Sequence, residues 1–119
     1  MQYMCLIYSA DSAGPVPETP EFGKMMEGYG AFTQEARENG VMTAGDPLQP
    51  VSTATTVRVR DGATQTADGP FAETKEQMGG YYILDCDNLD EAIEYAAKIP
   101  TAAFGSIEVR PIMVFDCEG

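Results

Sequence analysis

Asp68 is the side chain of this sequence best suited to a chemical role. It begins the segment Asp68-Gly69-Pro70-Phe71, in which turn-forming residues precede one large aromatic residue. An Asp that opens a Gly-Pro turn usually accepts backbone N–H bonds and builds the turn. Alternatively, the turn holds Asp68 rigidly at a cleft, as a general base or a ligand anchor. Phe71 would then form a wall of the pocket, or else fill the core or an interface.

Three charged residues follow in the same stretch. Glu73, Lys75 and Glu76 are suited to polarise a substrate, although surface ion pairing is the plainer explanation for them. Tyr8, Asp46 and Tyr82 are also placed to line a cleft, and the alternative for a strand tyrosine is packing with its hydroxyl group on a partner.

Glu108 and Arg110 lie two residues apart on an expected strand, so both side chains point the same way. They share that face with apolar Ile112 and Val114, a pattern that predicts partial burial. A buried Arg needs a carboxylate, from Glu108 or from a partner chain. The alternative is that Arg110 binds an anionic small molecule through its planar guanidinium group. The predicted catalytic residue is therefore Asp68, and the predicted ligand-binding residues are Tyr8, Asp46, Phe71, Glu73, Tyr82, Glu108 and Arg110.

The composition excludes several kinds of site. The chain of 119 residues has no histidine, which removes Ser-His-Asp and Cys-His catalysis and imidazole zinc sites. Its three cysteines, Cys5, Cys86 and Cys117, are widely spaced and form no Cys-x-x-Cys pair, so a disulfide framework is not expected. No spacing of carboxylates resembles a calcium loop. The sequence predicts neither a metal site nor a cofactor.

Net charge limits the partners. Nineteen acidic residues against seven basic ones give a formal charge of −12. Such a protein repels the phosphate backbone of nucleic acids and the surface of anionic membranes. No apolar run approaches the ~20 residues that span a bilayer, and the chain opens directly into a strand pattern, so a cytoplasmic location is expected.

The order of expected elements defines the fold. Strands are predicted at residues 1–8, 41–45, 53–60, 63–67, 81–86 and 107–115, with a connection at 46–50 and a hairpin turn at Asp61-Gly62. One helix follows Thr19-Pro20 and stops at Gly40, with an apolar stripe that includes Met25 and Met26. A second helix starts after Asn88 and ends before Pro100.

This order is β-α-β-β-α-β with an inserted hairpin, which predicts a single α+β domain of ferredoxin-like type over residues 1–119. Both helices would cover one face of the sheet. Several residues of the other face are apolar, so a face-to-face pair of sheets in a homodimer is expected.

Several segments resemble the YCII-related family, and specifically its DGPF branch. The central match is Asp68-Gly69-Pro70-Phe71-Ala72-Glu73-Thr74-Lys75-Glu76, followed by Gly79-Gly80-Tyr81-Tyr82. Further matches are Met4-x-Leu6-Ile7-Tyr8, Gly40-Val41-x-x-Ala44-Gly45, Leu89-Asp90-Glu91-Ala92 and Gly105-Ser106-Ile107-Glu108-Val109-Arg110-Pro111.

The resemblance implies a ferredoxin-like fold, a dimeric α/β barrel, a cleft near the subunit interface and, through family members encoded beside sigma factors, a regulatory connection. The His–Asp dyad of family members outside this branch is missing, because the first helix has no His and Ile99 precedes Pro100. We therefore expect a dimer that binds a small molecule in an interface cleft, with a regulatory role. The alternative is an acid–base enzyme, such as an isomerase, lyase or hydrolase, with Asp68 as base and Arg110 as anion clamp.

Overall fold

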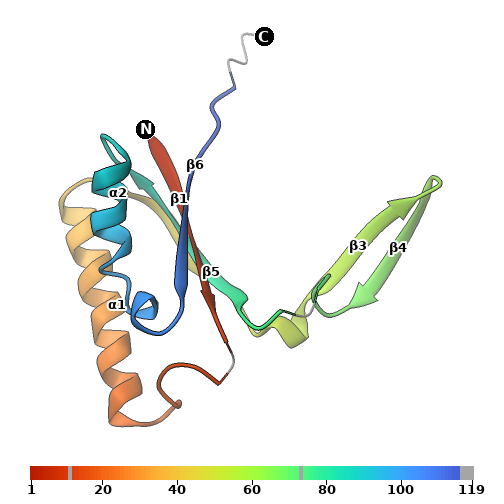
Figure 1. Ribbon diagram of the computed structural model, residues 1–119, viewed down its shortest axis with the longest axis horizontal. Coiled ribbons are helices and arrows are strands. Elements are labelled where there is room, and N and C mark those ends of the chain that lie inside the picture. The colour runs from red at the N-terminus through yellow and green to blue at the C-terminus, as the bar shows by residue number, and fades with distance from the viewer. Residues whose placement is uncertain (11, 73, 116–119) are drawn as a thin grey trace.

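The computed structural model describes residues 1–10, 12–72 and 74–115 and contains one four-stranded antiparallel sheet (Figure 1). Its strands lie in the order β2-β5-β1-β6, with two helices on one side. Numbered without the inserted hairpin, the order is 2-3-1-4, the ferredoxin-like arrangement expected from the sequence. The bounds are β1 Gln2–Ser9, α1 Pro20–Glu38, β2 Met42–Pro47, β5 Gln77–Asp85, α2 Leu89–Ala96 and β6 Ser106–Pro111.

Alternating side chains divide the sheet into a covered and an open face. Tyr3, Cys5 and Ile7 of β1 are buried against the helices, and Leu84 of β5 joins them in the core. Phe32 of α1 packs into this cluster. The intervening residues of β1 point to the other side of the sheet, where no helix lies. Since β1 is largely apolar on both faces, the packing of the helices decides which face is buried.

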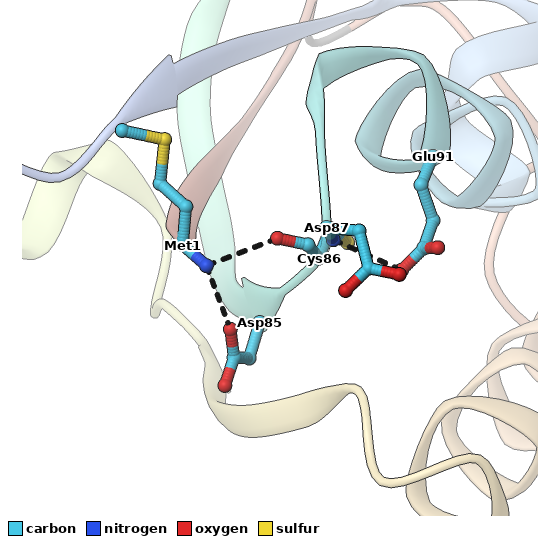
Figure 2. Close-up of polar contacts among 5 residues, drawn as sticks. All are labelled: Met1, Asp85, Cys86, Asp87 and Glu91. Atoms are coloured by element: carbon cyan, nitrogen blue, oxygen red, sulfur yellow. Dashed lines mark hydrogen bonds and ion pairs between the residues drawn. The ribbon is translucent and has the colours of Figure 1, made fainter.

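Both helices begin where capping residues predict. The Thr19 hydroxyl accepts the Phe22 N–H ahead of Pro20, and the Asn88 side chain accepts the Glu91 N–H at 2.9 Å. The returning bond of the second cap goes from the Asp87 N–H to the Glu91 carboxylate, one residue before Asn88 (Figure 2).

The start of β1 is tied to the end of β5 by charge. The Met1 ammonium group donates to Asp85 Oδ1 at 3.1 Å and to the Cys86 carbonyl at 3.0 Å (Figure 2). Both groups of the Met1–Asp85 pair are more than half exposed, so the pair adds little to the free energy of folding. Its effect is to keep the start of β1 next to the end of β5.

A hairpin arm projects from the body on the side of the sheet opposite the helices (Figure 1). It consists of β3 (Thr55–Arg60) and β4 (Ala63–Asp68), which pair with each other in a separate two-stranded sheet. Asp61 and Gly62 both have positive φ, as a two-residue hairpin turn requires. The arm raises the radius of gyration to 16.6 Å, whereas about 13–14 Å is typical of a compact chain of this length.

Several element boundaries differ from those predicted. Asp46 and Pro47 belong to β2 rather than to a connection, because β2 is an edge strand and an edge tolerates proline. β5 begins at Gln77 and includes both glycines, with a bulge opposite Ile7 and Tyr8. A 3-10 helix, η1 (Val51–Thr53), delays β3 to Thr55.

The last strand ends at Pro111, not Phe115. Its neighbour β1 begins at Gln2, whose carbonyl accepts the Ile112 N–H at 2.9 Å, so residues 113–115 have no strand to pair with. Met113, Val114 and Phe115 are exposed as a result. The prediction that Met26 belongs to the core is also wrong, since its side chain is 52% exposed.

Within the part of the chain that the structure describes, no helix is both long and apolar enough to cross a membrane.

Candidate functional site

A cleft of about 600 Å³ lies where the arm joins the body. One wall is most of the segment 48–56, which contains η1 and the start of β3, and a second wall comes from Pro70, Phe71, Ala72, Thr74 and Glu76. The floor is formed by Tyr8 of β1 with Gln77 and Met78 of β5. Tyr8 and Met78 are register partners, so the cleft opens on the face of the sheet that the helices leave uncovered.

Backbone hydrogen bonds hold the two walls in place. The Gly69 N–H donates to the Ala54 carbonyl at 2.7 Å, and the Thr56 hydroxyl donates to the Gly69 carbonyl at 2.8 Å. Leu48 is anchored to the sheet through its N–H, which donates to the Gly79 carbonyl at 2.9 Å. The cleft therefore has a fixed frame of main chain, which favours a pre-formed binding site.

The polar groups of the cleft are mainly acceptors. Gln77 Oε1 is buried and has no hydrogen-bond partner among the described residues. An unpaired buried acceptor costs about 1–3 kcal/mol. Gln77 is the register partner of Ser9, so its side chain points away from the open face to which Tyr8 and Met78 contribute. The Glu76 carboxylate lines the cleft and accepts the Ser106 hydroxyl at 3.2 Å. A ligand that offers N–H or O–H groups on an apolar framework would match this carboxylate.

Of the predicted motif residues, Phe71 lines the cleft but Asp68 does not. Phe71 lies in the second wall with 78% of its surface exposed. Asp68 is the last residue of β4, opposite Thr55 in the register, and it is exposed. Glu73 lies outside the described residues.

Two of the other predicted side chains lie away from the cleft. Asp46 accepts the Tyr81 hydroxyl at 2.7 Å on the open face, and this bond raises the pKa of Tyr81. Tyr82 points to the helices, where its ring lies 5.0 Å from that of Phe32. The structure therefore brings Tyr8 and Phe71 together and places Asp46 and Tyr82 elsewhere.

Glu108 and Arg110 form the ion pair that their spacing predicts, and both partners come from the same chain. The hydrogen bond from Glu108, and then its charge, raise the pKa of Arg110. The expected partial burial is wrong for Arg110, which is exposed because β6 is the outermost strand. Since Glu108 already balances its charge, Arg110 offers a weaker anion clamp than an unpaired guanidinium group.

Gln77 and the segment 48–56 are functional candidates that sequence reasoning missed. Gln77 follows the motif directly, which is the one signal that could have drawn attention to it. Residues 48–56 contain matches to the YCII-related family but were not predicted to form a site, and only the folding of the arm brings them against Tyr8.

The described thiols are not suited to nucleophilic chemistry. Cys5 and Cys86 are free and buried, and desolvation raises the pKa of each to about 11. No cluster of three or more His, Cys, Asp or Glu side chains that could hold a metal ion occurs within residues 1–10, 12–72 and 74–115. The absence of a cofactor remains a prediction.

Comparison with known proteins identifies the family. The model of the YCII-related domain matches residues 1–116. The chain belongs to the YCII-related family. Assignment to the DGPF branch, and the extent of the domain to residue 119, remain predictions.

A relative of this YCII-related protein is 37% identical over 117 residues, which cover 97% of this chain and 94% of the relative. It is described as uncharacterized protein R00369 of Rhizobium meliloti (strain 1021). Among solved structures, a 5-chloro-2-hydroxyhydroquinone dehydrochlorinase (TftG) from Burkholderia phenoliruptrix AC1100, in complex with 2,5-dihydroxybenzoquinone, is similar at 14% identity and a TM-score of 0.47. The alignment covers 95% of this chain and 94% of that one. This likeness is too distant to inform the function.

Proposed function

We propose that this YCII-related protein binds a small molecule in the cleft at the root of the arm. The observation that carries the proposal is the cleft of about 600 Å³, whose mostly apolar lining includes Tyr8 and Glu76 as polar groups. Clefts of this size suit small ligands, and a few convergent polar groups in an apolar lining give orientation and specificity. The preferred ligand is neutral or cationic and carries hydrogen-bond donors, because both Glu76 and the net charge of −12 disfavour anions.

We also propose that the protein acts as a homodimer paired through the open face of its sheet. Met4 and Leu6 of β1 and Ile83 of β5 are half-buried apolar residues on this face, at positions that alternate with the core residues. Pairing would remove them from water and would bring a second chain to the mouth of the cleft. A regulatory role beside a sigma factor rests on the family resemblance alone.

One observation favours the enzymatic alternative. The Glu76 carboxylate lines the cleft, while Asp68 lies outside the lining. An acid–base reaction in this cleft would therefore use Glu76 as base in preference to Asp68, with Tyr8 as the nearby hydroxyl group. Chromatography with mass spectrometry of a retained ligand before and after prolonged incubation separates catalysis from binding, since only an enzyme converts the ligand to a product, and an isomer is detected by its retention time.

Filling the cleft should abolish binding. Ala54→Trp places an indole in the first wall, and we expect the affinity for the neutral dye Nile red, followed by fluorescence, to fall at least about tenfold. Ala63→Trp at the tip of the arm is the matched control, because Ala63 is exposed and outside the cleft. Equal dye binding by both variants would place the dye elsewhere and contradict the assignment. Native mass spectrometry of protein from its own host then identifies the natural ligand.

Gln77→Leu should separate stability from binding. Leucine removes the buried unpaired acceptor, so the ligand-free variant is expected to gain about 1 kcal/mol in free energy of unfolding, measured with urea. Its affinity for Nile red should be unchanged, because the side chain points away from the open face of the sheet. A variant that loses stability instead would show that Oε1 has a hydrogen-bond partner in solution, and a loss of dye affinity would place the side chain in the cleft.

A further inference from the structure

One face of the arm is rich in β-branched residues that have no partner in a single chain. Val57 and Val59 lie opposite Thr66 and Thr64 in the register, so the four side chains share a face. Both valines are 59% exposed. Isolated two-stranded hairpins are at best marginally stable in water, and a third surface is normally needed to order them. Packing of another apolar surface against the face of Val57 and Val59 would therefore stabilise the arm.

We propose that the arm clasps a second copy of this chain, with the Val57–Val59 face buried against the partner. The inference rests on the dimer of the proposed function and adds the element that holds it together. The arm leaves the body on the open side of the sheet, away from α1 and α2 (Figure 1). A second copy packed on the open face would therefore lie beside the arm.

Charge favours a second copy as the occupant. Within the arm, residues 55–68, Arg58 and Arg60 balance Asp61 and Asp68, so the whole net charge of −12 lies on the rest of the chain. Two such bodies repel each other, and a neutral arm is the part that can approach an acidic copy at least cost.

The size of the arm indicates how much it contributes. A six-residue strand is ~20 Å long and two paired strands present a face ~10 Å wide, so the arm offers about 200 Å². A stable interface needs roughly 800 Å² on each partner, so the remainder must come from the sheet face. Loss of the arm contact should therefore weaken the dimer strongly without unfolding the body.

The clasp also has a consequence for the cleft. Thr55 and Thr56 at the root of the arm line it together with Tyr8 and Met78 of the open face. A partner held between arm and sheet covers the exposed side of this cleft, where Phe71 now faces solvent. Ligand binding and dimerisation should accordingly reinforce each other.

The test compares two double variants by sedimentation equilibrium of the full chain. Val57→Glu/Val59→Glu places carboxylates on the proposed interface, and the dissociation constant of the dimer should rise at least about tenfold. Arg58→Ala/Arg60→Ala is the matched control, because it changes the net charge by the same two units on the opposite face of the same strand. Its dissociation constant should stay within about threefold of the wild-type value. Circular dichroism checks that each body remains folded.

Three results would overturn the proposal: a wild-type protein that is monomeric at every concentration, a glutamate variant that dimerises like the wild type, or equal weakening by both variants. Nile red binding is measured on the same wild-type sample. The cleft is formed within a single chain, so it does not depend on the clasp. If the wild type binds the dye while the arm variants dimerise like the wild type, the clasp is contradicted and the binding cleft is retained.

Discussion

Gly105→Ala is expected to lower the free energy of unfolding by about 2–3 kcal/mol. A Cβ atom at residue 105 would overlap the backbone oxygen of Tyr8 and would lie 3.0 Å from Thr101 Cγ2 and 3.1 Å from Ser9 Cβ. Backbone cannot move aside as a flexible side chain can, and overpacking of this kind typically costs 1–3 kcal/mol. Because Tyr8 forms part of the cleft floor, Nile red affinity should fall as well.

Gly30→Ala provides the control for this variant. Gly30 lies within α1, and a Cβ atom there would have no heavy atom within 4 Å. Alanine in a helix interior is favoured over glycine by about 1 kcal/mol, so this substitution should stabilise the protein. Urea unfolding of both variants gives the two values. A Gly105→Ala protein as stable as the wild type would show that the close approach to β1 is relaxed in solution.

The free energy of unfolding is expected to fall as the pH rises from 9 towards 11. Burial raises the pKa of the Cys5 thiol from 9.0 to about 11, with a smaller effect from Cys86. A group whose pKa is raised in the folded state adds stability below its unfolded pKa, and this stability is lost as the pH rises through the folded value. A difference of two pH units corresponds to on the order of 2–3 kcal/mol for Cys5.

Cys5→Ala separates this thiol from other groups that titrate at high pH. The variant should be less stable at pH 8, because a fully buried side chain is shortened, yet its loss of stability between pH 8 and 11 should be smaller by about 2 kcal/mol. Tyr29 and Lys98, whose pKa values are also raised, titrate in both proteins alike. Parallel pH profiles for wild type and variant would contradict the role assigned to Cys5.

The local elements could be read from residue types because each depends on neighbours in the sequence. Thr19-Pro20 and Asn88 cap the two helices, Asp61-Gly62 makes the arm turn, and the apolar run of β1 predicts a central strand. Together these signals predict the ferredoxin-like order of elements. The boundaries at Pro47 and Pro111 were missed because they depend on which strand lies alongside, and residue type does not report that.

The candidate site was predicted less completely, for a physical reason. Phe71 and Tyr8 were identified as side chains suited to a pocket, and the Glu108–Arg110 pair followed from strand alternation. Asp68 attracted attention through its motif, yet it pairs with Thr55 at the root of the arm and lies outside the cleft. The opposite holds for Glu76, which the sequence suggested as a charge that could polarise a substrate and which the structure places in the cleft lining.

The sequence by itself determined the order of the secondary-structure elements and the absence of histidine chemistry, since composition and caps act over a few residues. Only the tertiary structure decided which face of the sheet is covered, where the arm projects, which segments enclose the cleft and which acceptor is left unpaired. Those properties arise from contacts between segments that lie far apart along the chain, such as Tyr8, residues 53–56 and residues 76–78. Such contacts are selected by packing of the whole domain, and no local pattern encodes them.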